Sequence, residues 1–129
     1  MKILLDTHIF LWALLTPEKL TDEAIELLES AGTEKYLSAA SSWEIAVKHA
    51  MGSLVLSESP REFVMANITA AGISPLPIGV RDTLQAIDLP PIHKDPFDRL
   101  LVAQAQANQM FLLTNDPVFE NYDVRIIDL

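Results

Sequence analysis

Short apolar runs alternate along the chain with segments of helical periodicity. The runs 3–5 and 111–113 are continuously apolar, which is typical of parallel strands covered on both faces. Further strands are predicted at 36–39 and 124–127. Residues 73–78 are also extended, but Pro75 and Pro77 restrict any strand there to an edge of the sheet.

The segments between these runs have the apolar spacing of helices. Ser59, Pro60 and Glu62 form a typical helix start, with a capping residue, a proline at the first position and an acid behind it. The predicted helices cover 9–15, 21–32, 41–52, 59–72, 80–87 and 95–108. Strands that alternate with helices predict an α/β sandwich, with helices on both faces of a mainly parallel sheet.

Two tryptophans lie in apolar helical stripes, and both are expected in the core. Trp12 belongs to the helix after the first strand. Trp43 begins the predicted apolar face of the third helix, which continues through Ala46, Val47, Ala50 and Met51.

Length and composition are those of one ordinary domain. The 129 residues are half hydrophobic, so we expect a single domain over 1–129 with one packed core. The absence of cysteine excludes disulfides and thiolate metal sites. Asp6 and His8 interrupt the apolar start, which argues against a signal peptide, and no apolar stretch approaches the roughly 20 residues of a membrane span. We expect a cytoplasmic protein.

The formal net charge of −9 is unusual for a protein that binds nucleic acid, because such proteins carry a basic surface. Carboxylates that hold divalent cations would nevertheless present positive charge to a phosphate. An acidic protein also suits a basic protein partner.

Four acids lie close to the ends of predicted strands. Asp6 follows the first strand and Asp116 the run 111–113, while Glu44 and Asp98 lie at the predicted starts of helices. The carboxyl ends of parallel strands share one edge, where ligands bind in open α/β sheets. The sequence therefore predicts that these four acids converge.

Each acid also has a simpler interpretation as a helix cap. Asp6 and Asp116 are plausible N-caps, Glu44 would complete a capping box with Ser41, and Asp98 would do so with Asp95. Asp98 fits this interpretation least well, because it shares a helix face with the apolar residues Leu101, Val102 and Ala105. An acid on such a face needs a partner, and a cation would serve.

Electrostatics favours a cation among these acids. Two carboxylates about 5 Å apart repel by roughly 3 kcal/mol at an effective dielectric constant of 20. Oxygen ligands without cysteine suit Mg²⁺ or Mn²⁺, which can activate water and polarise a phosphodiester. The predicted metal ligands and catalytic residues are Asp6, Glu44, Asp98 and Asp116.

Four segments together resemble the PIN-domain family, and within it the VapC-type toxins of bacterial toxin–antitoxin pairs. They are Leu4-Leu5-Asp6-Thr7-His8, Ser42-Trp43-Glu44, Asp95-Pro96-Phe97-Asp98-Arg99-Leu100-Leu101, and Leu113-Thr114-Asn115-Asp116. The resemblance covers essentially the whole chain in the right order.

The resemblance implies a five-stranded parallel sheet and Mg²⁺- or Mn²⁺-dependent cleavage of RNA. It also implies a homodimer and inhibition by a basic antitoxin. Thr7 and Thr114 would be supporting hydroxyls beside the four acids. Many relatives carry a further acid where this chain has Val118, so the resemblance leaves one metal ion or two open.

Several basic residues near the predicted rim are candidate RNA contacts. Lys48 lies four residues after Glu44, and either pairs with it or contacts a phosphate. Lys94 and Arg99 are further candidate contacts. His8 and His93 lie near the same rim, where a surface or packing role is the simpler interpretation.

Two other functions stay open at the level of sequence. The chain could be a non-catalytic PIN-like scaffold whose acidic face receives a basic partner. It could also be a phosphoryl-handling α/β domain, although Asp6-Thr7-His8 lacks the second aspartate that phosphatase chemistry would place two residues on.

Overall fold

Five parallel strands form one sheet at the centre of the protein. The structure, a computed structural model, describes residues 1–128. The strands lie in the order β3-β2-β1-β4-β5, and each neighbouring pair is parallel. Their bounds are β1 Lys2–Leu5, β2 Glu34–Ser38, β3 Ile73–Leu76, β4 Phe111–Thr114 and β5 Ile126–Asp128. The predicted α/β class, the parallel sheet and the edge position of β3 are confirmed.

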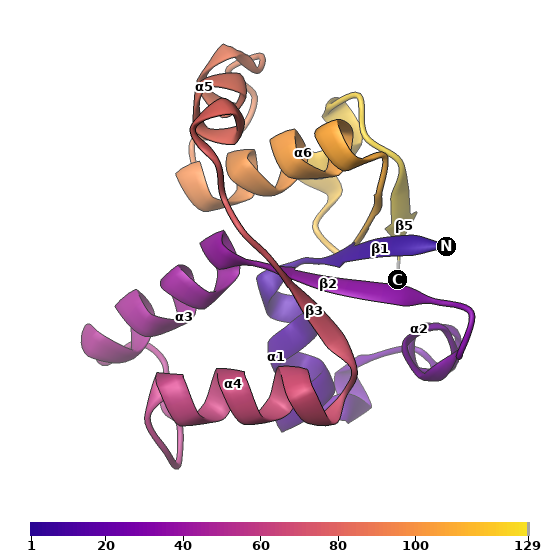
Figure 1. Ribbon diagram of the computed structural model, residues 1–129, viewed down its shortest axis with the longest axis vertical. Helices are drawn as coiled ribbons and strands as arrows, with labels where there is room; N and C mark the ends of the chain where they lie inside the picture. The colour runs from indigo at the N-terminus through magenta and orange to yellow at the C-terminus, as the bar shows by residue number, and fades with distance from the viewer. Residues whose placement is uncertain (129) are drawn as a thin grey trace.

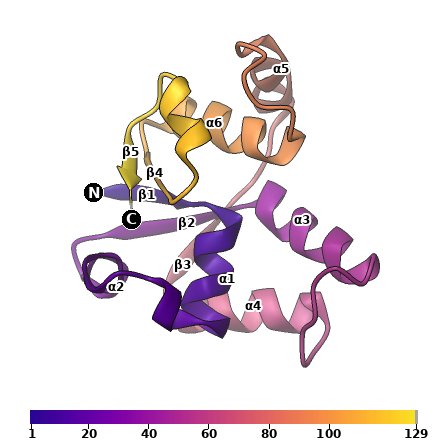
Figure 2. The same cartoon turned by 180° about the vertical axis from the view of Figure 1, so that it is seen from behind.

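Helices cover both faces of the sheet, as Figures 1 and 2 show from opposite sides. The helices α1 to α4 lie on one face, and α5 and α6 lie on the other. Their bounds are α1 Thr7–Leu15, α2 Asp22–Glu29, α3 Ala39–Ala50, α4 Pro60–Ala70, α5 Val80–Asp88 and α6 Pro96–Asn108, with short 3₁₀ helices η1 Pro17–Lys19 and η2 Pro117–Asn121. Among the described helices, none is both long and apolar enough to cross a bilayer.

Two apolar cores lie on opposite faces of the central strand β1, so the expectation of one packed core is wrong. Ile3 and Leu5 pack with the helices of the α1 side, whereas Leu4 packs with Leu101 and Val102 of α6. All three strand residues are at most 1% exposed. The alternation of β1 side chains between two covered faces explains why its sequence is continuously apolar.

Local sequence signals place most helix starts correctly. The hydroxyls of Thr21 and Ser59 accept from Ala24 N and Glu62 N, and Asp95 Oδ1 accepts from Phe97 N. These bonds satisfy backbone donors that the first turn of a helix leaves free. The final strand begins at Ile126, two residues later than predicted, and Ala39 belongs to α3 instead of to β2.

The prediction for the apolar face of α3 is wrong. Its buried residues are Ala40, Ser41, Glu44 and Ile45, while Trp43 is 64% exposed and Met51 is 76% exposed. The helix is rotated relative to the prediction because two polar residues, Ser41 and Glu44, face inward. Trp12, by contrast, is partly buried against the core, as expected.

The topology places a switch in strand order between β1 and β4. The chain leaves β1 into α1 on one face and enters β4 from α6 on the other. The strand order therefore reverses between these two neighbours, which is where open α/β sheets bind ligands, beyond the carboxyl ends of the strands. Asp6 and Thr114 stand at this point.

Candidate metal centre

Asp6 is fixed where β1 meets α1. Its backbone N–H donates to Leu113 O at 3.0 Å, and its Oδ2 accepts from the Thr114 hydroxyl at 2.8 Å. The side chain makes no capping bond to α1, so its interpretation as a helix cap is wrong. Burial raises the pKa of Asp6, and the charge of Glu44 adds to the increase, while the bond from Thr114 opposes it.

Glu44 is buried in the second turn of α3. Ser38, and not Ser41, caps this helix, so Glu44 is its sixth residue and takes no part in a capping box. Its side chain is 3% exposed, and Oε2 lies 2.7 Å from Lys48 Nζ, which confirms the expected pair. The other oxygen, Oε1, is buried without a hydrogen-bond partner.

Asp98 lies in the first turn of α6, where it contacts His93. Its side chain is 14% exposed, and Oδ2 lies 2.7 Å from His93 Nε2. Leu101, Val102 and Ala105 on the same helix are buried, as the shared face predicted. Burial, and then the negative charges of Asp6, Asp95 and Glu44, raise the pKa of Asp98 to about 7.

Asp116 begins the segment after β4. Its Oδ1 accepts from Val118 N at 3.0 Å, so one oxygen caps η2, and the prediction of Asp116 as an N-cap is confirmed. Its own N–H donates to Thr114 Oγ1 at 3.0 Å. The Thr114 hydroxyl therefore links two of the predicted acids, because it donates to Asp6 and accepts from Asp116.

The tightest group of potential metal ligands differs from the predicted set. One ligand atom each from His93, Asp98 and Asp116 lie within 4.8 Å of one another. Asp6 and Glu44 are not in that group; they lie deeper, at 2% exposed each, and their charges act on Asp98. From the sequence, His93 is expected near the rim with a surface or packing role, because a lone histidine in a proline-rich loop carries no spacing signal for a metal ligand.

The residues present suit a divalent cation. Burial, and then the negative charges of neighbouring acids, raise the pKa values of Asp6 and Asp98, so these carboxylates are destabilised in their charged form. The buried Oε1 of Glu44 lacks a donor, which is costly unless something positive faces it. Carboxylate oxygens suit Mg²⁺ and Mn²⁺, and an imidazole nitrogen is accepted more readily by Mn²⁺ than by Mg²⁺.

Two residues predicted near the site have other contacts. The Thr7 hydroxyl donates to the buried Ser41 Oγ at 2.8 Å, so it supports α3 and not a carboxylate. The Arg99 guanidinium donates to five carbonyl oxygens at the end of α5 and in the loop after it, those of Ala86, Ile87, Leu89, Pro90 and His93. Because the guanidinium already donates to backbone carbonyls, we no longer propose Arg99 as an RNA contact.

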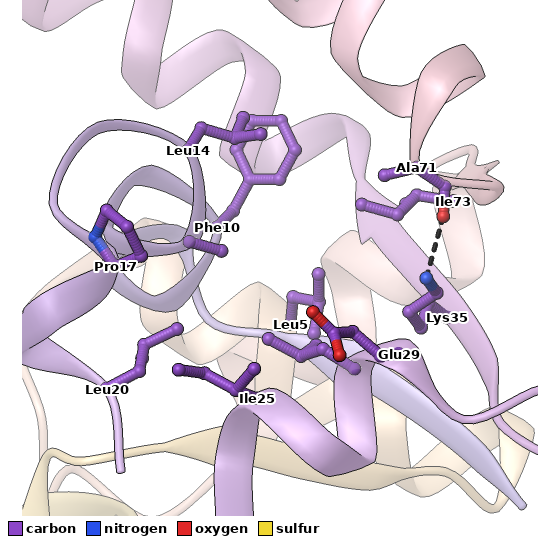
Figure 3. A pocket seen from close by; sticks show the side chains of 12 residues that line it. Leu5, Phe10, Leu14, Pro17, Leu20, Ile25, Glu29, Lys35, Ala71 and Ile73 are labelled. Carbon is purple, nitrogen blue, oxygen red and sulfur yellow. Dashed lines mark hydrogen bonds between the residues drawn. The ribbon is translucent and has the colours of Figure 1, made fainter. Parts of the chain in front are cut away.

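A separate apolar cavity of about 390 Å³ lies on the α1 side of the sheet (Figure 3). Phe10 and Leu14 of α1, Leu20, and Ile25 of α2 line it, with Ile73 opposite. Glu29 and Lys35 are its charged residues, and Lys35 Nζ donates to Ala71 O at 2.7 Å. None of the four predicted acids lines this cavity, so it is distinct from the candidate metal centre.

Comparison with known proteins points to one family. The family description that matches is the PIN domain, over residues 3–125. VapBC2 from Rickettsia felis, bound to a promoter DNA fragment, is similar in structure with a TM-score of 0.73 and 16% identity, over 99% of this chain and 98% of that one. FitAcB from Neisseria gonorrhoeae is similar with a TM-score of 0.63 and 20% identity, over 98% of this chain and 96% of that one. DNA-bound VapBC from Salmonella typhimurium is similar with a TM-score of 0.68 and 15% identity, over 99% of this chain and 98% of that one. No curated protein matches the sequence.

Proposed function

The chain belongs to the PIN domain family, and from that premise we propose that it is a metal-dependent endoribonuclease and the toxin of a toxin–antitoxin pair. The observation that carries the proposal is the convergence of Asp98 with Asp116 and His93 beside two buried acids, one of which has an unpartnered oxygen. Segments distant in sequence thereby supply one acidic group near the topological switch point.

The acids have separate tasks in this proposal. Asp98 and Asp116 would hold the cation from the more open side, with Asp6 and Glu44 behind them. When bound, the ion would supply charge to a phosphodiester and lower the pKa of water. Thr114 keeps Asp6 in place through its hydroxyl. Lys48 balances the charge of Glu44 and, with the exposed Lys94, offers an ammonium group to an RNA phosphate.

The test is cleavage of RNA by the purified protein with Mn²⁺, with Mg²⁺ and in EDTA. We expect cleavage only with a divalent ion, and none for Asp6→Asn, because that variant keeps the shape but removes a charge that holds the cation. Asp22→Asn, in the exposed first turn of α2, is the matched control and should cleave normally.

The alternatives give different results in the same experiment. A non-catalytic scaffold would leave RNA intact, and Mn²⁺ would not change its melting temperature. A phosphoryl-handling domain would turn over a chromogenic phosphomonoester and not RNA. Cleavage in EDTA by Asp6→Asn would also contradict the proposal.

We further propose a basic antitoxin as partner, which the acidic net charge of −9 favours. The neighbours described above are complexes of such pairs, which supports the proposal for this chain. The apolar cavity of Figure 3, with Glu29 at its edge, is where we expect the partner's apolar and basic side chains. Hydrogen exchange of the complex with the product of a neighbouring short reading frame should show protection over α1 and α2; protection elsewhere would contradict this placement.

A homodimer is the remaining part of the proposal. The helix α5 stands at one end of the molecule (Figures 1 and 2) and exposes Val80, Leu84 and Ile87 by 60% or more. This spacing forms an apolar stripe that a second copy would cover. Light scattering should give the dimer mass for the wild type and the monomer mass for Leu84→Lys. A monomeric wild type would contradict the homodimer without affecting the nuclease proposal.

A further inference from the structure

His93 lies within the candidate metal centre although no sequence motif pointed to it. It occupies the loop between α5 and α6, and its Nε2 lies 2.7 Å from Asp98 Oδ2. The same imidazole and one oxygen each of Asp98 and Asp116 lie within 4.8 Å of one another. A nitrogen donor therefore takes part in the tightest group of ligand atoms within residues 1–128.

The position of His93 is fixed by the segment that carries Asp116. The backbone N–H of His93 donates to the Tyr122 hydroxyl at 2.8 Å. The imidazole ring of His93 packs edge-on against Phe119 at a centroid distance of 6.3 Å. Phe119 belongs to η2, which Asp116 caps, and Tyr122 directly follows it. On the other side, Arg99 Nη1 donates to the His93 carbonyl at 3.3 Å. Two contacts to the backbone of His93 and one to its ring thus fix the residue beside Asp98.

The dimensions of the group match one coordination shell. Around an octahedral ion with bonds of about 2.1 Å, neighbouring ligand atoms are roughly 3 Å apart and opposite ones roughly 4.2 Å apart. Three atoms that lie within 4.8 Å of one another need only small movements to fit this geometry. Asp116 Oδ1 already accepts from Val118 N, so its second oxygen is the one that would turn to the ion.

A second, independent observation suits a cation at this centre. Glu44 Oε1 is buried without a hydrogen-bond partner, and the residue as a whole is 2% exposed. The charge of Glu44 acts on both Asp98 and Asp6, so its carboxylate belongs to the surroundings of the candidate metal centre. A buried carboxylate oxygen with no donor is costly, and a cation in that space would remove the cost.

We propose that His93 Nε2 is a direct ligand of the divalent cation, together with carboxylate oxygens of Asp98 and Asp116. This inference rests on the proposed function and assigns a residue of the same site. Ligation needs the lone pair of Nε2, so the ring proton must be on Nδ1. Ligation would replace the 2.7 Å hydrogen bond between Nε2 and Asp98 Oδ2 by a bond from each of these atoms to the ion. It would also displace the weak contact of Asp95 N with Nδ1, which is 3.5 Å long.

A nitrogen ligand changes which ion the site prefers. Mg²⁺ strongly favours oxygen ligands, whereas Mn²⁺ and the later divalent metals accept imidazole more readily. The proposal therefore predicts that the protein binds Mn²⁺ more tightly than Mg²⁺, and that the preference depends on His93. In the His93→Gln variant, Mn²⁺ affinity should fall by roughly tenfold or more, while Mg²⁺ affinity changes less.

The test is pulsed electron paramagnetic resonance of Mn²⁺ bound to the full chain, with affinities from calorimetric titration. The wild-type spectrum should contain a ¹⁴N coupling from a directly bound imidazole, and His93→Gln should lose it. His49→Gln, in the last turn of α3, is the matched control and should keep the coupling. Circular dichroism and thermal unfolding check that both variants fold.

The outcomes separate this inference from the proposed function. Mn²⁺ that binds the wild type with no ¹⁴N coupling would overturn ligation by His93 and leave a metal-dependent nuclease in place. Coupling that persists in His93→Gln would also overturn it. A wild type that binds no Mn²⁺ and no Mg²⁺ would overturn both proposals.

Discussion

The Thr114 hydroxyl donates a 2.8 Å hydrogen bond to Asp6 Oδ2 across 108 positions of sequence. Both residues are at most 2% exposed, and they stand at the ends of the two neighbouring strands where the strand order reverses. The bond lowers the pKa of a carboxyl group that burial raises. It therefore stabilises the charged form of Asp6 that cation binding requires.

Replacing this hydroxyl gives the first prediction. Thr114→Val keeps the β-branched shape, so strand β4 should form, but it leaves a buried oxygen of Asp6 without its donor. We expect the free energy of unfolding to fall by about 1–3 kcal/mol at pH 8 without metal, as measured by urea unfolding. Thr83→Val, on the exposed surface of α5, is the control. An equal loss in both variants would contradict the assigned role.

The pair between Glu44 and Lys48 gives the second prediction. Lys48→Met leaves the Glu44 carboxylate with neither oxygen partnered, since Oε1 has no partner already. Because Lys48 is 42% exposed, solvent screens part of the effect, and we expect a loss of about 1–3 kcal/mol. The double variant with Glu44→Gln should regain most of this stability in urea unfolding. A double variant no more stable than Lys48→Met would show that the charge of Glu44 is not the cause.

Arg99 gives the third prediction. Its guanidinium donates to five carbonyls that terminate α5 and form the loop to His93. Arg99→Gln should therefore cost roughly 2–3 kcal/mol and accelerate hydrogen exchange over residues 86–95. Arg125→Gln, the control, loses one hydrogen bond, to Gln109 O, and should leave hydrogen exchange over residues 86–95 unchanged. Unchanged hydrogen exchange over residues 86–95 in Arg99→Gln would show that Arg99 does not stabilise this loop.

The pH dependence of stability gives the fourth prediction. The pKa of Asp98 rises from 3.8 to about 7 on folding, so the folded state holds more protons than the unfolded state between these values. Stability from this group is therefore present below pH 4 and is lost as the pH rises toward 7. Each pKa unit corresponds to about 1.4 kcal/mol, which gives roughly 4 kcal/mol for the whole rise. Because Asp98 is partly exposed, solvent screens part of the effect, and we expect a loss on the order of 2–4 kcal/mol.

This effect is measurable by variant and by metal. Urea unfolding in EDTA at pH 5 and pH 8 should show a smaller difference for Asp98→Asn than for the wild type, and Asp88→Asn, at the exposed end of α5, should behave like the wild type. Mn²⁺ should restore wild-type stability at pH 8, because it binds only the folded state. An Asp98→Asn variant with the wild-type pH dependence would show that Asp98 does not titrate in this range.

The fold followed from the sequence because its signals are local. The continuously apolar 3–5 and 111–113, the prolines of 73–78, and caps such as Ser59 each determine a strand or a helix start through neighbouring residues alone. Four acids near strand ends were visible for the same reason. The face of α3 was predicted wrongly because Ser41 and Glu44 are polar but buried, and only contacts from Thr7 and Lys48 explain that.

The sequence by itself determined the elements, their parallel arrangement and the residue types of the site. Tertiary structure decided which side chains meet. His93 reaches Asp98 through a loop held by Arg99, Phe119 and Tyr122, and no periodicity encodes such a contact. The depth of Asp6 and Glu44, and the raised pKa of Asp98, likewise depend on burial and on charges brought from separate segments. Local patterns report backbone preference, whereas the electrostatics of a site arises from distances that only the folded chain sets.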